Sequence, residues 1–169
     1  MKVSEIYGKQ VISTQGRQGY VISVNAHKDR LECLICADES EREFVIDFKN
    51  VLSIGEKIVF EDRESEILKA TPLRLGRASF DEKGNYLGTL NDFTVLGKQL
   101  KSAKIGKKNY PADGVIFGDA VIVKSSRRLK SDVVKDGGII LKKGTVVTDQ
   151  ILDEAAAAGE YIQTTLKSI

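Results

Sequence analysis

The stretch Ile54-Gly55-Glu56-Lys57-Ile58-Val59-Phe60 has a counterpart about sixty residues later, Phe117-Gly118-Asp119-Ala120-Val121-Ile122-Val123. Both read as an apolar residue, a glycine, an acid, a variable residue and then a run of residues that favour β-strands. Each closes a segment that opens with two glycines: Gly16 and Gly19 in the first, Gly84 and Gly88 in the second. The shared order and spacing predict one small β-unit used twice.

Short β-rich segments separated by turn residues fill both copies, and the predicted fold class is therefore mainly β. In the first copy we expect strands at 11–13, 19–24, 31–36 and 44–48 and a last β-segment at 51–60 broken by Gly55, with a turn at 25–29 and an acidic loop at 38–43. In the second copy we expect strands at 77–80, 86–96 and 99–105 and closing strands within 110–123 around Gly114 and Gly118, with turns at 81–85 and 106–109.

Two stretches resemble the PRC-barrel family of small β-barrels. The order Ser4–Val11, a glycine turn, and then Gly19-Tyr20-Val21 with a β-run is similar to the start of that domain. Asp81–Asp92 resembles the family's turn and strand more closely, and Leu75-Gly76 stands where the family has its lead-in. The resemblance spans roughly residues 1–125 and implies two consecutive small PRC-like β-barrels. The family includes the cytoplasmic domain of the photosynthetic reaction centre H subunit and the C-terminal domain of a ribosome maturation factor.

The resemblance and the turn residues together predict the domain boundaries. We expect a first PRC-like β-barrel at 1–65, a linker at 66–72, a second barrel at 73–125, and a basic linker with a short β-hairpin and α-helix at 126–169. Pro72 disfavours both helix and sheet in the first linker.

Capping residues predict the shorter elements near the two ends of the sequence. Ser4 is the expected N-cap of a single helical turn. In the last region the hairpin is expected within 138–147, and the helix at 149–158 between Thr148 as N-cap and Gly159 as C′ residue.

Composition is that of a soluble globular protein, with 41% hydrophobic and 30% charged residues in a chain of 169. The sequence contains neither a signal-peptide core nor a run near the ~20 apolar residues that span a bilayer. We therefore expect a cytoplasmic protein with no membrane span.

Charge is distributed unevenly along the chain. Residues 1–72 carry 10 Lys/Arg against 13 Asp/Glu, residues 73–133 carry 12 against 6, and residues 134–169 carry 4 against 5. The net charges are −3, +6 and −1. This asymmetry fits an anionic partner, or attraction between the acidic and basic regions of two protomers in a homodimer, or the same attraction within one chain. Solvated lysines on an ordinary surface are the simpler explanation.

Residues that could support catalysis or metal binding are few. Cys33 and Cys36 have the C-x-x-C spacing, but they lie in a predicted strand and the chain offers only His27 as a further soft ligand. We expect both thiols to be reduced and structural, with at least one buried. Glu39, Glu41 and Glu43 fit protection of a strand edge. No nucleophile elbow, phosphate loop or dinucleotide fingerprint occurs, so we predict no catalytic residue, metal or cofactor.

Basic residues supply the only candidate binding site. The run Lys124–Lys130 follows the last strand of the second copy, and more lysines crowd a predicted hairpin turn. Such clusters bind phosphates, although 7% aromatic residues give few platforms for base stacking. A solvated linker is the alternative. The candidate binding residues are Lys104, Lys107, Lys108, Arg127, Arg128 and Lys130.

The functional hypothesis is a non-catalytic adaptor that engages a macromolecular partner, most simply a protein, in an assembly or maturation role. It depends on the resemblance. The rival hypothesis is an RNA- or ribosome-associated binding module that uses the basic second barrel. An enzyme of unknown class is the least favoured alternative, because every standard catalytic constellation is missing from the sequence.

Overall fold

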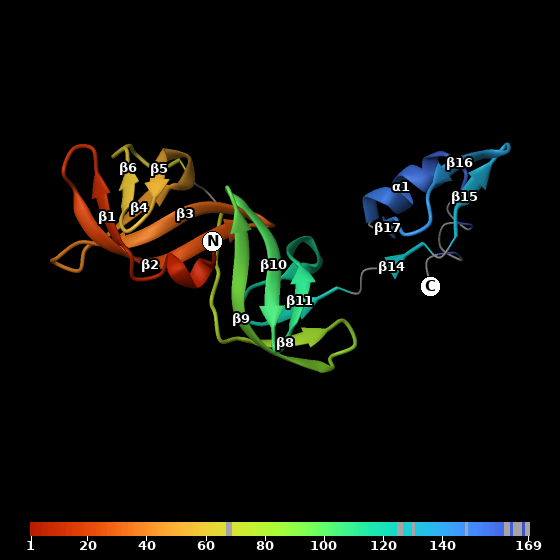
Figure 1. Ribbon diagram of the computed structural model, residues 1–169, viewed down its shortest axis with the longest axis horizontal. Helices are drawn as coiled ribbons and strands as arrows, with labels where there is room; N and C mark the ends of the chain where they lie inside the picture. Colours follow the sequence, from red (N-terminus) through yellow and green to blue (C-terminus); the bar gives the residue numbers. More distant parts are fainter. Residues whose placement is uncertain are drawn as a thin grey trace. The chain divides into compact units, whose positions relative to one another are not determined.

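The computed structural model describes residues 1–66, 69–124, 127–129, 131–147, 149–160, 163 and 167. The chain divides into two compact units, Met1–Lys124 and Ser125–Ile169, which are treated separately below. The described chain is mainly β, as predicted, with one short α-helix near its end (Figure 1).

The first half of Met1–Lys124, residues 1–60, contains a 3₁₀ turn η1 (Val3–Glu5) followed by six strands. Strands β1 to β4 pair in succession as antiparallel neighbours, β5 pairs antiparallel with β6, and β6 runs parallel to β1. The elements after η1 are β1 (Gln10–Ser13), β2 (Gln18–His27), β3 (Arg30–Ala37), β4 (Glu43–Asp47), the 3₁₀ turn η2 (Phe48–Asn50), β5 (Val51–Ile54) and β6 (Ile58–Phe60).

The second half, residues 73–124, has the same order and the same pairing. Strands β8 to β11 are successive antiparallel neighbours, β12 pairs antiparallel with β13, and β13 runs parallel to β8. Among the described residues neither half pairs its fourth strand with its fifth, so closure into the two predicted barrels is not seen, and strands β1 to β13 belong to one 13-stranded sheet. The elements are β8 (Ala78–Asp81), β9 (Tyr86–Leu96), β10 (Gln99–Ile105), β11 (Lys108–Pro111), the 3₁₀ turn η3 (Ala112–Gly114), β12 (Val115–Ile116) and β13 (Val121–Val123).

Irregularities in the strand pairing also match. In the first half, Ile22 and Glu32 are the extra residues at two breaks in the β2–β3 register. In the second half, Asn91 and Lys101 are the extra residues at two breaks in the β9–β10 register. Because a bulge re-aims the strand around it, matching bulges give the two halves equivalent positions, residue by residue.

The turn that opens each half is built alike. The Ser13 hydroxyl accepts from the backbone N–H groups two and four residues later, at 3.2 and 2.8 Å. The Asp81 carboxylate does the same at 2.9 and 2.8 Å, and its hydrogen bonds from Asn85 are the main reason that its pKa lies below the usual value. In both turns the fourth residue is a glycine with positive φ, Gly16 at 91° and Gly84 at 83°, as the sequence predicts.

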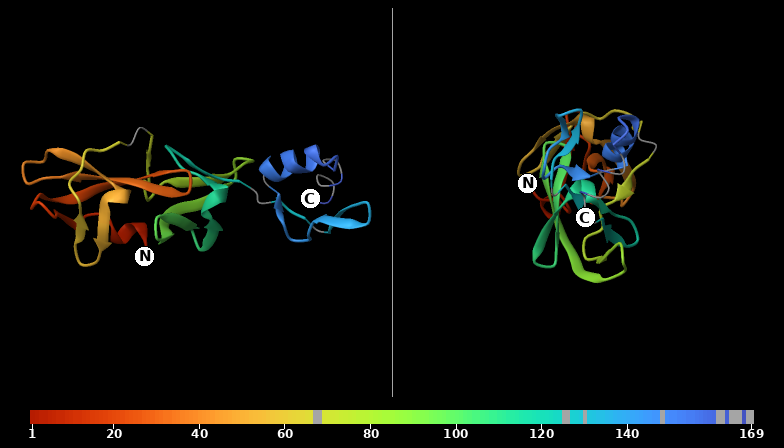
Figure 2. Two further views of the ribbon diagram at one scale, coloured as in Figure 1. Left: turned by 90° about the horizontal axis from the view of Figure 1, so that it is seen from above. Right: turned by 90° about the vertical axis from the view of Figure 1, so that its right-hand side faces the viewer.

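The two halves are joined reciprocally. Leu31 N–H donates to Lys98 O at 2.8 Å, and the equivalent Leu100 N–H donates to Asp29 O at 2.7 Å. The segment leading into each half also lies along the long strand of the other: β7 (Thr71–Pro72) pairs with β2, and Lys2 bridges to Thr94 of β9. Figure 2 shows the N-terminus beside β9, and one buried apolar core includes residues of both halves.

Three local predictions are wrong. Pro72 does lie in a short strand, because Leu73, the next residue, supplies the N–H that bonds Val24 O. Ser4 caps no helix: the turn starts after Lys2, and the Ser4 hydroxyl instead bonds the Asp92 carboxylate. The predicted turn at 25–29 is shorter, because pairing with β3 and β7 extends β2 through His27.

Ser125–Ile169 contains two small antiparallel pairs and a helix. Strand β14 (Arg127–Arg128) pairs with β17 (Val146–Val147), and β15 (Val133–Lys135) with β16 (Gly138–Leu141), before α1 (Asp149–Ala157). The predicted hairpin within 138–147 is therefore wrong. The hairpin turn lies earlier, at Asp136-Gly137, whose φ angles of 51° and 79° suit a two-residue turn.

The predicted helix at 149–158 is confirmed to within one residue, and Gly159, with φ 80°, follows its end. Thr148, its predicted N-cap, lies outside the described residues. Among the described residues no helix is long and apolar enough to cross a membrane.

Candidate binding surfaces

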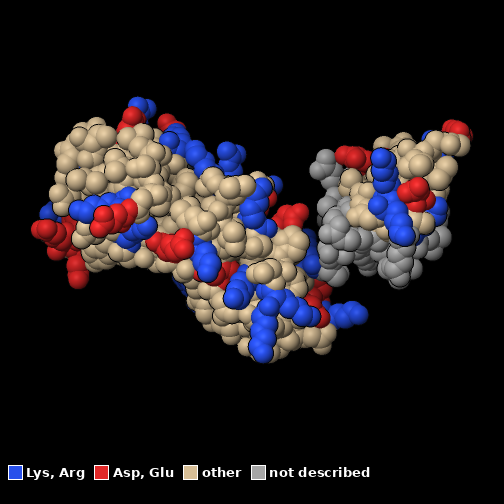
Figure 3. Space-filling view, viewed as in Figure 1, with Lys and Arg blue, Asp and Glu red and all other residues tan. Residues whose placement is uncertain are grey.

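The predicted basic site falls into two groups. Lys104 on β10, Lys107 in the turn and Lys108 at the start of β11 are exposed on one hairpin of the second half. Figure 3 shows Lys and Arg side chains spread over this half, and acidic ones gathered at the loop between β3 and β4. The backbone of Arg127 and Arg128 forms β14 of the other unit, and Lys130 lies outside the described residues.

The outer face of β2–β3–β4 is apolar where a solvated sheet is usually polar. Ser23, Ile35 and Val45 are paired neighbours across the three strands, and Ile22 bulges beside them. Val45 is 38% exposed and Ile22 37%. The residues of the neighbouring row point to the opposite face of the sheet and are buried in the core: Val24, Leu34 and Ile46. An apolar patch left in solvent commonly marks an interaction surface. We call Tyr20, Ile22, Ile35 and Val45 the apolar face; Tyr20 is 40% exposed at its end.

The equivalent positions of the second half are polar. Asp92, Lys104 and Asn109 are the paired neighbours that correspond to Ser23, Ile35 and Val45, and Asn91 corresponds to Ile22. Lys104 therefore occupies the position of Ile35. Within the described part of the chain no ion pair involves Lys104, Lys107 or Lys108.

A groove of about 840 Å³ adjoins the apolar face through Ile22 and Ser23. The segments leading into the two halves contribute the other lining residues, Ser4, Tyr7, Pro72, Arg74, Leu75, Gly76 and Arg77. Among the described residues no acidic side chain lines it. Tyr7 is fixed there, because its hydroxyl donates to Leu73 O at 2.7 Å. We call it the arginine groove.

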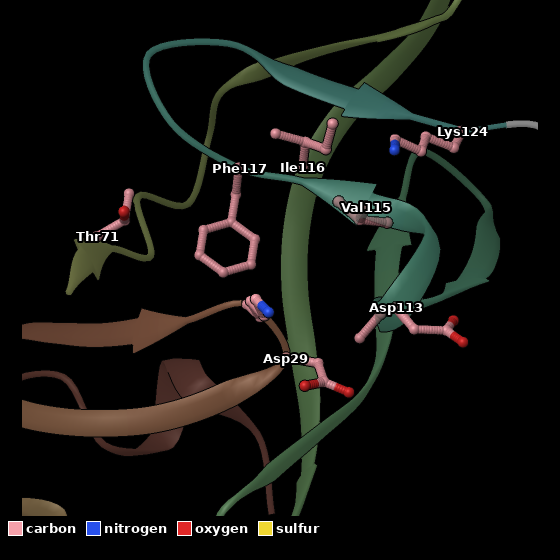
Figure 4. A pocket seen from close by; sticks show the side chains of 9 residues that line it. Asp29, Thr71, Asp113, Val115, Ile116, Phe117 and Lys124 are labelled. Atoms are coloured by element: carbon pink, nitrogen blue, oxygen red, sulfur yellow. The ribbon is translucent and has the colours of Figure 1, made fainter. Parts of the chain in front are cut away.

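A second cleft, of about 480 Å³, lies where the β2–β3 turn meets η3 and β12 (Figure 4). The Phe117 ring points into it and packs edge-on against Phe93, with ring centres 5.8 Å apart. Its charges are mixed, since Lys28 and Lys124 line it together with Asp29 and Asp113. Mixed charge at this density specifies no ligand class.

A third cleft, of about 510 Å³, occupies the equivalent place in the first half, around η2. His27 lines it as the exposed last residue of β2, not as a turn residue. Arg30 and Lys98 lie there too, but so do Glu32, Asp47 and Glu66. Lys49 pairs with both Asp47 and Glu66, so much of this charge is already compensated.

Cys33 and Cys36 are both buried and free, which confirms the prediction that at least one is buried. Cys36 belongs to the core, whereas Cys33 lies on the outer face between Asn25 and Asp47. Burial raises the pKa of Cys33 to about 11, with further contributions from Asp47 and Glu32. Burial raises the pKa of Cys36 to about 12. Neutral, buried thiols are poor nucleophiles and poor metal ligands.

Among the described residues no group of three or more His, Cys, Asp or Glu side chains is placed to hold a metal ion. The sequence reasoning missed the apolar face and the arginine groove. A usable signal was present in Val21-Ile22-Ser23-Val24 and Leu34-Ile35-Cys36, where apolar residues point to both sides of a strand.

Comparison with known proteins adds no assignment to this geometry. No protein-family model matches the chain, and no curated protein matches it.

Proposed function

We propose that the protein is a non-catalytic adaptor, made of two PRC-like β-domains, that docks a protein partner in an assembly or maturation role. The observation that carries this proposal is the apolar face. Ile22 and Val45 are each more than a third exposed in a sheet whose opposite face is a fully packed core. Desolvating such a surface against a partner is favourable at about 25 cal/mol per Å² of apolar area.

The tandem PRC-like organisation is supported by the equivalence of the two halves. Strand order, pairing direction, both bulges and the opening glycine turn correspond. A duplicated scaffold frees one copy to change its surface while the other keeps its own, and only one copy here has an apolar outer face.

Matched substitutions on the two outer faces test the adaptor proposal. Val45→Arg places a charge in the apolar face, and Asn109→Arg places the same charge at the equivalent position of the second half. Pull-downs from lysate, with nuclease and at low and high salt, should lose the partner proteins with Val45→Arg only. Retention of every partner by a folded Val45→Arg variant would overturn the adaptor function, and so would turnover of a small substrate.

A second function, RNA or ribosome binding, is favoured by one observation. Lys104, Lys107 and Lys108 project from one hairpin without ion pairs in the described residues. Arg127, Arg128 and Lys130 would add to this charge if both units met the same nucleic acid. Such binding should be sensitive to nuclease and should weaken steeply with salt. Lys104→Glu with Lys107→Glu should abolish it while leaving protein partners bound.

A further inference from the structure

The arginine groove is a place where half-buried positive charge lacks a counterion. Arg77 is half-buried, and among the described residues its guanidinium has no hydrogen bond or ion pair. Arg74 has only a long contact to Asp119, at 3.9 Å, and its side chain is 53% exposed. A guanidinium held away from bulk water gains most from a carboxylate, which it binds with two parallel hydrogen bonds.

The groove also offers apolar contacts. Leu75 and Pro72 line it with the Tyr7 ring, and Ile22 belongs both to the groove and to the apolar face. A ligand that fills the groove and continues onto this face must therefore present apolar groups beside acidic ones. A small anion would leave the apolar lining uncovered.

We propose that the arginine groove and the apolar face together bind a segment of a partner protein in which apolar side chains stand next to Asp or Glu. The carboxylates pair with Arg74 and Arg77, and the apolar side chains pack on Ile22, Ile35 and Val45. Charge complementarity decides the choice of occupant, since the described lining residues of the groove include two arginines and no acid. This inference rests on the proposed adaptor function, which supplies the need for a docked protein.

The loop between β3 and β4 sets the orientation of that segment. It carries Asp38, Glu39 and Glu41 next to the Tyr20 end of the apolar face, where Tyr20, Ala37 and Glu43, the first residue of β4, form one row across the sheet. The acidic part of the segment is repelled from this loop and attracted to the groove. Opposite charges at two borders of one apolar surface allow a single direction of docking.

Short fluorescent peptides provide the test, used with the complete chain. In one peptide leucine alternates with glutamate, in the second leucine alternates with lysine, and in the third serine alternates with glutamate. We expect the Leu/Glu peptide to bind most tightly and to shift the amide resonances of Ile22, Ser23 and Arg77. The double variant Arg74→Ala with Arg77→Ala should weaken binding about tenfold or more, since each charge-assisted hydrogen bond lost can cost a factor near ten.

The double variant Lys104→Ala with Lys107→Ala is the matched control, because it removes two cations of the β10–β11 hairpin, which does not line the groove, and should leave peptide binding unchanged. Within the part of the chain that the structure describes, the side chains of the groove arginines make no bond beyond the long Asp119 contact, so their variants should fold normally by circular dichroism. Equal binding of the Leu/Lys peptide, absence of Leu/Glu binding, or displacement of that peptide by oligouridylate would overturn the inference.

The result separates this inference from the adaptor proposal itself. If Val45→Arg releases the natural partners while Arg74→Ala with Arg77→Ala retains them, the adaptor function stands and the acidic-segment assignment falls. If Val45→Arg releases nothing, the adaptor function falls first.

Discussion

The two halves of Met1–Lys124 place different side chains on equivalent positions of one strand-pairing scheme. Ile22, Ile35 and Val45 in the first half correspond to Asn91, Lys104 and Asn109 in the second. Both sets face outward, so neither is required by the core that lies beneath. The scaffold therefore constrains the inward-facing residues and the turns, while the outward-facing residues are available for function.

Inward positions obey a common requirement for close packing. Val24 and Leu34 in the first half correspond to Phe93 and Ala103 in the second, and all four are fully buried. The larger Phe93 stands in place of Val24 and the smaller Ala103 in place of Leu34, so the total side-chain volume is roughly preserved. Such compensation is what two copies of one scaffold need if each is to remain well packed.

The largest predicted effect concerns a glycine shared by both halves. Gly19 pairs with Val11 as Gly88 pairs with Ser79, and a Cβ at Gly19 would lie 2.4 Å from Ala37 O. Because Ala37 O belongs to the backbone, it cannot move aside easily, so Gly19→Ala should lower the free energy of unfolding by about 3 kcal/mol. Urea denaturation measures the loss.

The control is Gly55, a glycine of the repeated motif Ile54–Phe60. A Cβ at Gly55 would meet only Lys57 O, at 4.0 Å, so Gly55→Ala should change stability little. Equal losses for Gly19→Ala and Gly55→Ala would show that the close approach at Gly19 is not what holds β2 against its neighbours.

A smaller effect is expected at Asp47, the last residue of β4. Asp47 is almost fully buried and pairs with Cys33 of the neighbouring strand, and its carboxylate accepts hydrogen bonds from the Ser65 hydroxyl and from the Glu66 N–H. Asp47→Ala should cost about 2 kcal/mol, since hydrogen bonds to a charged group contribute more than neutral ones. It should also lower the raised pKa of Cys33, because the negative charge of Asp47 contributes to that rise.

Thiol alkylation separates this local effect from general loosening. In a Cys36→Ala background, Asp47→Ala should speed modification of Cys33 at neutral pH, because more thiolate is present and the thiol is less covered. In a Cys33→Ala background, Cys36 should remain slow. Asp38→Ala is the control: it removes two turn hydrogen bonds without uncovering Cys33. Equal acceleration of both thiols would contradict the local explanation.

Much of the fold could be predicted because its strands end at glycines. β9 and β10 occur with the predicted bounds, since Gly84, Gly97 and Gly106, all with positive φ, punctuate them. The predicted turn at 25–29 was too long, because tertiary pairing with β7 keeps polar Asn25 in a strand. Asp136-Gly137 was a readable hairpin signal that the apolar run after it obscured.

The candidate site was predicted less well than the fold. Local sequence placed Lys104, Lys107 and Lys108 on one hairpin, since only a turn separates them. The arginine groove combines Ser4 and Tyr7 with Arg74 and Arg77, which only the reciprocal lead-in segments bring together. Such a site depends on how the two halves associate, and patterns within a single sequence do not indicate that association.

Ser79 offers a test of the core rather than the surface. It occupies the position of Val11 and is fully buried, and its hydroxyl has no hydrogen-bond partner among the residues that the structure describes. Ser79→Ala should therefore raise the unfolding free energy by about 1 kcal/mol, because the desolvated hydroxyl is removed. Ser13→Ala should have the opposite sign, since the Ser13 hydroxyl accepts from Gln15 and Arg17. A loss of stability with Ser79→Ala would mean that this hydroxyl is satisfied in solution.

The smallest predicted effect compares three turns. Asp38–Arg42 repeats the hydrogen bonds of the turns that begin at Ser13 and Asp81, but its fourth residue is Glu41, with φ 59°, where the others have glycine. A left-handed residue with a Cβ costs about 1–2 kcal/mol, and glycine returns part of that through its greater freedom in the unfolded chain. Glu41→Gly should therefore stabilise the protein by about 0.5 kcal/mol. Gly16→Ala should destabilise it by about 1 kcal/mol, because it places a Cβ on a left-handed residue.

Thermal melting of Glu41→Gly and Gly16→Ala measures both changes in stability. Glu41→Gln is the control that separates relief of the backbone from loss of negative charge in the acidic loop. If Glu41→Gln stabilised as much as Glu41→Gly, charge repulsion and not the backbone would distinguish this turn from its two counterparts.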